Sequence, residues 1–533
     1  MSRSPAASSH SRSDPAPAAP HRWREVATQR LLRETFDLVV IGGGITGAGV
    51  ARDAALRGLR TALIEREDFA SGTSSRSSRL IHGGVRYLEH GHLRLVFESS
   101  RERRTLLRIA PHLVRPLAFT WPVYRGARIS RLKLAAGLAL YDALALFRNV
   151  ARHDVLSARG VLESEPLLRR EALKGGARYF DASTDDARLT LANVMAARDA
   201  GAVVLNHAPV SALVRSPARV TGVEVLDTAS MHGVTVRAEI VVNATGPWSD
   251  EIRRLESPAG PPTIRGAKGA HIAVPRSRVG NRDALALLHP TDGRVLFVVP
   301  AGEQAIVGTT ETLSLAPPGQ VRASREDVRY LLAAANYFFP ATGLGERDVI
   351  SAWAGIRPLA AALTGEETGS ASREHAIAEG PGGMVHVTGG KLTTYRAMAE
   401  EIVDDVLRRL GSPMVRKCVT ASQPLPGGEI SLPMVREEAR TITDPRLRDR
   451  LTASYGTRWE QVWSLGERDG RLRVPVADDV PFIGAEYVYA AAEEMAESLG
   501  DLLIRRTPAA FETRDHAIGM APAVARLVAP VLE

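Results

Sequence analysis

Three glycines directly after a short apolar segment dictate how the start of this chain folds. Residues 36–41 are mostly Phe, Leu, Val and Ile, and Gly42, Gly44 and Gly47 follow in the spacing G-x-G-x-x-G. A strand, a tight turn and a helix over 45–58 account for this pattern. Glycines in such a turn let a pyrophosphate approach backbone amides at the positive end of the helix. The segment therefore predicts a dinucleotide site.

A second predicted strand, at 61–64, ends at Glu65 and completes a βαβ unit of about 30 residues. Parallel strands follow from such a unit. An acidic side chain at this position can accept hydrogen bonds from the ribose hydroxyls of a nucleotide. The fingerprint does not distinguish FAD from NAD, so the cofactor has to be inferred from the residues that follow Glu65.

The pattern of a strand, glycines and a helix returns late in the chain, and a pattern typical of antiparallel strands lies between the two. Residues 239–243 predict another buried strand, and 384–388 predict a strand that leads through glycines into a helix over 394–410. Between them, 295–299 and 305–309 flank a short turn, as in an antiparallel hairpin. We expect a separate substrate-side sheet there.

These patterns divide the chain into parts. Residues 1–33 are rich in Ser, Ala, Pro and Arg without hydrophobic periodicity, which predicts a disordered basic tail. We expect an oxidoreductase region at 34–415, with cofactor-binding segments at about 36–125, 187–255 and 355–410, substrate-domain segments at about 126–186 and 256–354, a linker at 416–433 and a C-terminal helical domain at 434–533.

Composition excludes several classes of protein. The single cysteine, Cys418, rules out a disulfide framework and any multi-cysteine metal site, so we expect no metal. No apolar segment predicts a signal peptide or a membrane span, and we expect a cytoplasmic protein. The net charge of +8 favours an anionic partner such as a phospholipid surface or a phosphorylated substrate. No basic-aromatic module indicates nucleic-acid binding.

The hydroxyl-rich loop after Glu65 carries a more specific signal. Residues 71–89 read SGTSSRSSRLIHGGVRYLE, which can wrap phosphates and then bends at two glycines. The companion motifs are NATGPW at 243–248, KGAH at 268–271, GIRPL at 355–359 and GGKLTTYR at 389–396. In order and spacing these motifs resemble those of the aerobic FAD-dependent glycerol-3-phosphate dehydrogenases. The resemblance runs from about residue 36 to 396 and continues more weakly to the C-terminus.

The resemblance implies a fold of the α/β and α+β classes. Its parts would be a glutathione-reductase-type FAD-binding Rossmann domain, an antiparallel-sheet substrate domain and a C-terminal α-helical domain. It also implies that FAD is bound non-covalently. On the matching motifs, the cofactor-binding residues would be Gly42, Gly44, Gly47 and Glu65 for the ADP half, Thr73, Ser74, Ser75 and Ser77 for the phosphates, and Gly246, Gly389, Gly390, Leu392 and Thr393 near the flavin ring.

A phosphorylated substrate requires cations that stay charged when partly buried, and Arg suits phosphate because its planar guanidinium grips two oxygens. The candidates within the motifs are Arg86, Arg357 and Lys391. Only five of the 68 basic residues are lysine, so Lys391 between glycines favours a point-charge role. His271 can take a hydroxyl proton as hydride leaves the carbon, and Tyr87 is expected to orient the substrate by a hydrogen bond. These five residues form the predicted catalytic set.

The expected reaction is oxidation of sn-glycerol 3-phosphate to dihydroxyacetone phosphate, with hydride passing from C2 to flavin N5. The family's electron acceptor is ubiquinone or menaquinone, so the resemblance implies peripheral contact with the inner face of the cell membrane. It also implies a homodimer. Residues 128–148 combine basic side chains with leucines at helical spacing and are a candidate for contact with anionic lipid, although such a stripe is more often core.

Two alternatives stay open at this point. A glycerol-3-phosphate oxidase of the same architecture would pass its electrons to oxygen and form hydrogen peroxide. A related FAD oxidoreductase would act instead on an amino acid or a 2-hydroxy acid, because fold does not fix function.

Overall fold

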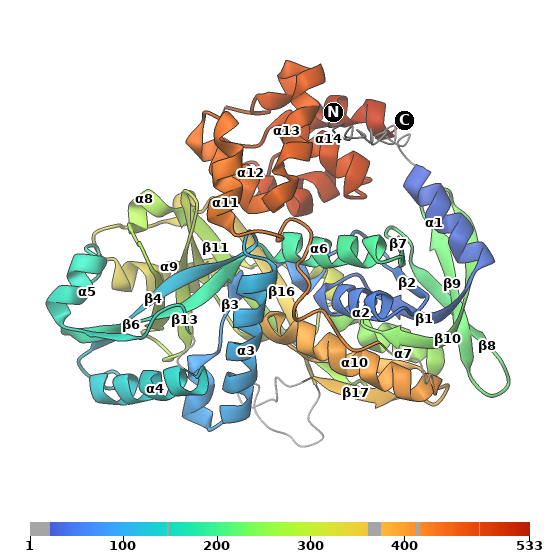
Figure 1. Cartoon of the computed structure of the whole chain (residues 1–533). Coiled ribbons are helices and arrows are strands. Elements are labelled where there is room, and N and C mark those ends of the chain that lie inside the picture. Colours follow the sequence, from blue (N-terminus) through green and yellow to red (C-terminus); the bar gives the residue numbers. More distant parts are fainter. Residues whose placement is uncertain (1–21, 147–148, 361–374, 412–415, 479, 533) are drawn as a thin grey trace, which may run out of the picture.

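The computed structural model describes residues 22–146, 149–360, 375–411, 416–478 and 480–532. Two domains, each built around a large sheet, lie side by side, and a helical C-terminal domain sits over their junction (Figure 1). This arrangement agrees with the predicted fold class.

The first sheet is parallel at its centre. Its inner strands are β1 (Thr35–Ile41), β2 (Thr61–Ile64), β7 (Val203–Leu205), β10 (His232–Asn243) and β18 (Val385–Thr388), in the order β18-β10-β1-β2-β7. Antiparallel strands extend it, namely β8 (Val210–Arg215), β9 (Val220–Asp227) and β17 (Ala376–Glu379). The predicted βαβ unit is confirmed, because α2 (Ile45–Leu56) connects β1 to the parallel strand β2.

Helices cover the first sheet because alternate residues of each strand face opposite sides. Leu38 and Val40 pack against α2, α6 (Asp186–Asp199) and α10 (Tyr395–Leu410), whereas Val39 and Ile41 face α1 (Arg22–Arg33) and β9. Helix α7 (Ser249–Glu256) packs beside β10 and β18, and α3 (Leu93–Ile109) lies between this part and the second domain. Burial on both faces explains the continuous apolar run at 36–41.

The prediction of a disordered tail over 1–33 is wrong for residues 22–33, which form α1. Leu31 is fully buried, and Ala27 one turn earlier packs in the same cluster. Arg24 is also buried, because it forms an ion pair with Asp227 and donates to the backbone oxygen of Asn206 at 2.9 Å. The sequence did not predict this helix because only a few apolar residues and an ion pair with a residue distant in the sequence stabilise it. The rest of the predicted tail, 1–21, lies outside the described residues.

The second sheet is mostly antiparallel. Its strands are β3 (Leu80–Ile81), β4 (Val114–Tyr124), β5 (Asp154–Leu156), β6 (Leu173–Thr184), β11 (Ile264–Pro275), β12 (Ala284–Leu288), β13 (Val295–Ala301), β14 (Gln304–Gly308), β15 (Thr312–Leu313) and β16 (Ser351–Ala360). The predicted hairpin is confirmed by the antiparallel pair β13 and β14. One pair, β4 with β12, is parallel, which differs from the antiparallel sheet predicted. Strand β4 also lies within 36–125, which the sequence assigned to cofactor binding, so this segment contributes strands to both sheets.

The helices of this second domain lie around the sheet and leave part of one face open to a cavity. They are α4 (Arg131–Leu144), α5 (Ala158–Ser164), α8 (Arg276–Val279) and α9 (Arg325–Phe338). Ile272 and Val274 of β11 pack with Leu331 of α9, so the intervening residues of β11 point to the opposite face. Among the described residues, no helix combines the length and hydropathy that a membrane span requires.

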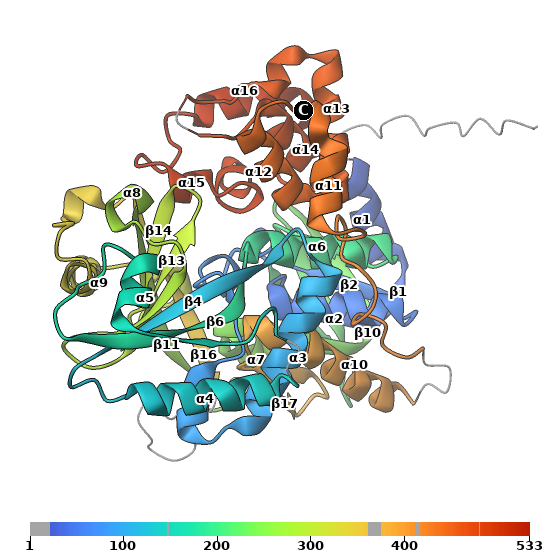
Figure 2. The same cartoon turned by 60° about the vertical axis from the view of Figure 1, so that its left-hand side comes forward.

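The C-terminal domain is helical, as predicted. Its helices are α11 (Leu432–Glu438), α12 (Pro445–Tyr455), α13 (Trp459–Arg468), α14 (Gly484–Glu493), α15 (Ala509–Glu512) and α16 (Ala521–Leu532). Two apolar clusters form its interior. Figure 2 shows α15 where this domain meets the second sheet, beside β14.

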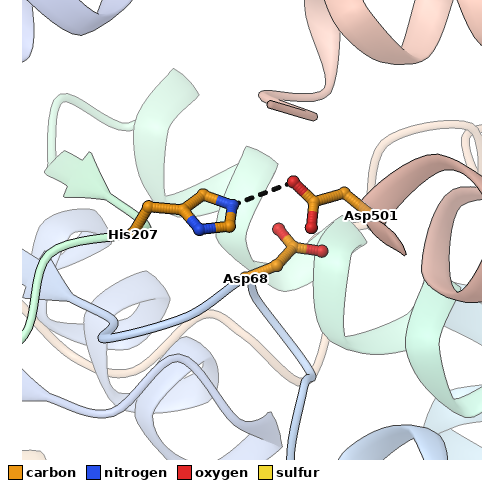
Figure 3. Close-up of side chains that lie close together, drawn as sticks. All are labelled: Asp68, His207 and Asp501. Atoms are coloured by element: carbon orange, nitrogen blue, oxygen red, sulfur yellow. Dashed lines mark hydrogen bonds and ion pairs between the residues drawn. The ribbon is translucent and has the colours of Figure 1, made fainter. Parts of the chain in front are cut away.

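Buried ion pairs tie the C-terminal domain to the loop that follows β2. Asp68 in that loop accepts hydrogen bonds from Arg506 at 2.6 and 2.9 Å, and His207 Nε2 lies 2.9 Å from Asp501 Oδ2 (Figure 3). Ligand-type atoms of Asp68, His207 and Asp501 lie within 4.8 Å of one another, a spacing that metal sites also have. Here Arg505 and Arg506 bind the same carboxylates, so the cluster acts as a domain junction.

Candidate active site

A cavity of about 600 Å³ lies between the carboxyl ends of the first sheet's strands and the open face of the second sheet. Ligands of open parallel sheets bind at the carboxyl ends of the strands, where the loops leave room. Its lining includes Glu65 and the glycine turn, and also His271 and Arg357. Motifs that are far apart in the sequence therefore share one site.

The glycine turn forms the floor of this cavity. Gly42 has a φ of +107°, and a Cβ there would lie 2.7 Å from the backbone oxygen of Ala244. Gly44 precedes the first turn of α2 and lines the cavity, whereas Gly47 lies behind it. A Cβ on Gly47 would lie 1.9 Å from the oxygen of Gly42, so the helix can pack on the strand only with glycine there. The turn thus exposes the positive helix end to the cavity.

Glu65 is buried at the end of β2 and lines the cavity. Its carboxylate accepts hydrogen bonds from the backbone N–H of Gly43 at 2.6 Å and of Glu67 at 2.9 Å. Burial raises the pKa of Glu65, against the opposing effect of these hydrogen bonds. The side chain is therefore fixed beside the glycine turn, where a ribose would lie.

The hydroxyl-rich loop wraps the glycine turn. Ser74 Oγ accepts a hydrogen bond from the N–H of Ile45 at 2.9 Å, and Thr73 Oγ1 donates to the oxygen of Ile356 at 2.7 Å. Ser77 donates to the buried carboxylate of Asp186 at 2.6 Å. Thr73, Ser74 and Ser77 line the cavity, but Ser75 is buried and is absent from its lining.

Two predicted cations line the cavity and define what we call its cationic end. Lys391 Nζ lies 3.8 Å from the ring centroid of Tyr87, and both residues line the cavity. Arg357 Nη1 lies 3.4 Å from Glu311 Oε1, and these two residues also line it. The side chain of Arg86 lies outside the described part of the structure. Cationic groups with a cation–π or ionic partner can exchange that partner for an anionic ligand.

His271 sits on β11 with its ring in the cavity lining, although only 3% of the residue is exposed. Its Nε2 lies 2.8 Å from Ser78 Oγ. Burial and the positive charges of Arg357 and Arg79 lower the pKa of His271 to about 3. The imidazole is therefore neutral near pH 7 and has a nitrogen lone pair that can accept a proton.

Most of the predicted site residues meet in this one cavity. Those that line it are Gly42, Gly44, Glu65, Thr73, Ser74, Ser77, Tyr87, Gly246, His271, Arg357, Gly389, Gly390, Lys391, Leu392 and Thr393. Gly47 and Ser75 lie behind the lining, at the helix–strand contact and within the hydroxyl-rich loop.

Four further residues of the site were missed by the sequence analysis. Ser78 and Glu311 line the cavity and contact His271 and Arg357, respectively. Arg294 also lines it and donates to the backbone oxygen of Glu311 at 2.5 Å. Trp353 stacks on the ring of His271. Ser78 lies in the hydroxyl-rich loop, which could have suggested it. Trp353 depends on strand register, and Arg294 and Glu311 lie next to the ends of β13 and β15.

Two family models match successive parts of the chain. Residues 37–404 match the family described as FAD dependent oxidoreductase, and residues 418–533 match the C-terminal domain of alpha-glycerophosphate oxidase. The first match covers more than half of the chain. It includes the glycine turn, the hydroxyl-rich loop and the cationic end of the cavity.

Individual relatives are similar along almost the whole chain. Glycerol-3-phosphate dehydrogenase 2 of Mycobacterium tuberculosis is 40% identical over 97% of this chain and 88% of its own length. Aerobic glycerol-3-phosphate dehydrogenase of Staphylococcus haemolyticus is 36% identical over 91% of this chain and 88% of its own. The crystal structure of glycerol-3-phosphate dehydrogenase from Bacillus halodurans, complexed with FAD, superposes with a TM-score of 0.79 at 32% identity, covering 96% and 94% of the two chains.

Proposed function

The chain belongs to the FAD-dependent glycerol-3-phosphate dehydrogenases, and we propose that its cavity oxidises the C2 hydroxyl of glycerol 3-phosphate and that the electrons pass to a membrane quinone. The observation that carries this proposal is the single cavity in which a glycine-lined nucleotide cradle meets Arg357, Lys391 and His271. The product is dihydroxyacetone phosphate.

The residues present fit a non-covalent FAD. A Cβ at Gly42 or Gly47 would collide with backbone, so the cradle requires glycine, and the amides of α2 point at the place where a pyrophosphate would lie. Glu65 is placed to accept the ribose hydroxyls, and Thr73, Ser74 and their neighbours are placed beside the phosphates. When bound, FAD supplies the acceptor for the hydride from C2.

We assign the phosphate of the substrate to the cationic end of the cavity. Arg357 offers a planar pair of donors, and Lys391 adds a compact charge beside Tyr87. We also assign Arg86 to this group, on the basis of the motif at 71–89 alone. Holding the phosphate there orients the C2 carbon, and orientation of this kind contributes strongly to rate.

His271 is proposed as the group that takes the C2 hydroxyl proton. Its low pKa makes it a weak base in the resting site. Proton acceptance is therefore expected to accompany departure of the hydride, when the hydroxyl becomes far more acidic. The neutral form is available throughout the physiological pH range, so no prior deprotonation step is needed.

Contact with an anionic membrane surface is proposed for the outer face of α4. Leu134 and Leu138 of this helix are buried, whereas Leu132 is 81% exposed and Leu140 is 43% exposed. Basic residues are also exposed at the start of the helix, including Lys133. Apolar side chains flanked by basic ones favour the interface of anionic lipid.

A homodimer is proposed from the family alone, and light scattering of the purified protein tests it.

The electron acceptor is tested by turnover under argon with a soluble quinone analogue. We expect dihydroxyacetone phosphate to accumulate only when both glycerol 3-phosphate and the quinone are present. Turnover in air without quinone, with an equivalent of hydrogen peroxide for each product, would show an oxidase instead. Turnover with an amino acid or a 2-hydroxy acid but not with glycerol 3-phosphate would show a different donor.

Membrane contact is tested by co-sedimentation with vesicles of phosphatidylglycerol and of phosphatidylcholine. We expect binding to the anionic vesicles and its loss in the double variant Leu132→Ser and Leu140→Ser. Leu315→Ser serves as the matched control, because Leu315 is fully exposed but lies outside α4. Equal binding by all three proteins would exclude α4 as the contact.

A further inference from the structure

The ring of His271 is confined by residues of two neighbouring strands. On β11, His271 lies opposite Gly308 of β14 and Trp353 of β16. A Cβ on Gly308 would lie 2.1 Å from His271 Cδ2, so the imidazole occupies the space that this glycine leaves. On the other side, the indole of Trp353 stacks on the imidazole at a centroid distance of 5.4 Å and an interplanar angle of 12°. The two strands thus fix the plane of the ring.

Ser78 fixes the remaining freedom of the ring within that plane. Its Oγ lies 2.8 Å from Nε2, so a flip of the imidazole would break this hydrogen bond. The position of the imidazole therefore depends on Trp353 for its plane and on Ser78 for its orientation. Trp353 is itself only 7% exposed, so the residues that cover its indole also determine the position of the imidazole.

The indole of Trp353 is covered by the C-terminal domain. Phe511 of α15 meets it edge-on at a centroid distance of 5.3 Å and an angle of 69°. The guanidinium of Arg79 lies over both rings, at 5.8 Å from Trp353 and 5.4 Å from Phe511. Edge-to-face aromatic pairs of this kind contribute packing energy beyond the area they bury. Phe511 is the C-terminal side chain that joins the stack behind His271.

The backbone of Phe511 is anchored to the same sheet. Its carbonyl oxygen accepts a hydrogen bond from Ser351 Oγ at 2.7 Å and one from Gln304 Nε2 at 3.3 Å. Ser351 lies on β16 and Gln304 on β14, the two strands that flank β11. These hydrogen bonds therefore attach the C-terminal domain to the two strands that hold the His271 ring. The attachment point on β16, Ser351, is two residues from Trp353.

We propose that Phe511 is a positioning residue for His271, and that the C-terminal helical domain sets the orientation of this imidazole through Trp353. The proposal rests on the role given to His271 in the proposed function. It assigns to the C-terminal domain a part in the reaction, although none of its described residues lines the cavity. If the phenyl ring is removed, the indole loses its cover and the imidazole loses the fixed face against which it stacks.

The kinetic test is a double-mutant cycle of Phe511→Ala and His271→Asn. We expect Phe511→Ala to lower kcat roughly 10- to 100-fold, the scale of a small misplacement of a reacting group, with KM for glycerol 3-phosphate and FAD content little changed. In the His271→Asn background the same change should have no further effect on kcat, because Phe511 acts through the missing ring. Phe511→Leu, which keeps most of the volume, should recover much of the rate and also covers the case in which the alanine variant folds poorly.

Arg514→Ala is the matched control for a general weakening of the domain contact. Arg514 follows α15 and donates to the backbone oxygens of Arg347 and Val349 at 2.7 and 3.3 Å, and within the described residues its hydrogen bonds do not reach Trp353. We expect this variant to keep the wild-type kcat. Additive effects of Phe511→Ala and His271→Asn, or an equal loss of rate in Arg514→Ala, would overturn the proposal.

A second readout does not depend on the substrate. In protein labelled with ¹⁵N-histidine, the ring signal of His271 is identified by its loss in His271→Asn. We expect Phe511→Ala to shift or broaden this signal and Arg514→Ala to leave it unchanged. An unchanged signal in Phe511→Ala overturns the positioning role. If glycerol 3-phosphate fails to reduce the wild-type protein, the proposed function fails, and the ring signal still decides whether Phe511 positions His271.

Discussion

The substitution Arg357→Gln removes the proposed phosphate cation while keeping a side chain of similar length. Arg357 is 27% exposed in its side chain and faces Glu311, which is 15% exposed, at 3.4 Å. A hydrogen bond to a charged group contributes about 1.5–3 kcal/mol. Each step of about 1.4 kcal/mol is a factor of ten, so we expect kcat/KM for glycerol 3-phosphate to fall about 10- to 150-fold.

The neighbouring carboxylate adds to this loss and offers an internal control. Without the guanidinium, Glu311 would face the phosphate with its charge no longer balanced by Arg357, and like charges repel across a partly buried site. The double variant Arg357→Gln and Glu311→Gln should therefore recover part of the lost kcat/KM. Arg357→Lys keeps the charge but not the planar pair of donors, and we expect a smaller loss.

The assay is steady-state turnover with a soluble quinone analogue, with inorganic phosphate as a competitive inhibitor. The inhibition constant of phosphate should rise in Arg357→Gln along with KM, whereas the FAD content should be unchanged. A change of less than about threefold in kcat/KM, with phosphate inhibition intact, would refute the assignment of Arg357 to the phosphate.

Three further outcomes follow from the structure. Because burial and nearby arginines lower the pKa of His271 to about 3, kcat should show no inflection from this residue between pH 5 and 8, and an inflection that disappears in His271→Asn would contradict this. Burial alone lowers the pKa of His207, but the ion pair with Asp501 outweighs burial and raises this pKa. The ion pair therefore stabilises the fold below about pH 6.5, and this stabilisation is lost as the pH rises. The difference in thermal unfolding between wild type and His207→Gln should be larger at pH 5.5 than at pH 8.5. Gly47→Ala, whose Cβ would collide with the oxygen of Gly42, should cost about 1–3 kcal/mol of unfolding free energy and reduce FAD content, whereas Gly137→Ala, in open space on α4, should not destabilise.

The parts of the fold that the sequence predicts are those with strong local patterns. The strand at 36–41, its glycines and the helix after them form one continuous signal, and the structure places β1 and α2 there within two residues. The strand at 384–388 and the helix over 394–410 are recovered in the same way as β18 and α10. Each of these segments carries its own apolar periodicity and its own glycine boundary.

The parts that escaped prediction depend on contacts between distant residues. Helix α1 is held by Arg24 against Asp227, which lies 203 residues away. The parallel pairing of β4 with β12 reflects how the second sheet closes, which no local pattern encodes. In each case the deciding contact is tertiary.

The same division applies to the candidate site. The glycines, Glu65 and the motif cations could be proposed from the sequence, because phosphate and ribose demand particular residue types at particular spacings. The contact of Ser78 with His271 spans 193 residues, and Trp353 reaches the same ring only through strand register. The contacts that orient the proposed base were therefore visible only once the sheet was assembled.

The central claim is tested most directly by anaerobic reduction of the purified protein with glycerol 3-phosphate. Oxidised flavin absorbs at about 450 nm, and we predict that this band is present and bleaches on addition of glycerol 3-phosphate but not of glycerol. A yellow protein that glycerol 3-phosphate leaves unbleached would contradict the assignment of the donor. A colourless protein that cannot be reconstituted with FAD would contradict the account of the cavity itself.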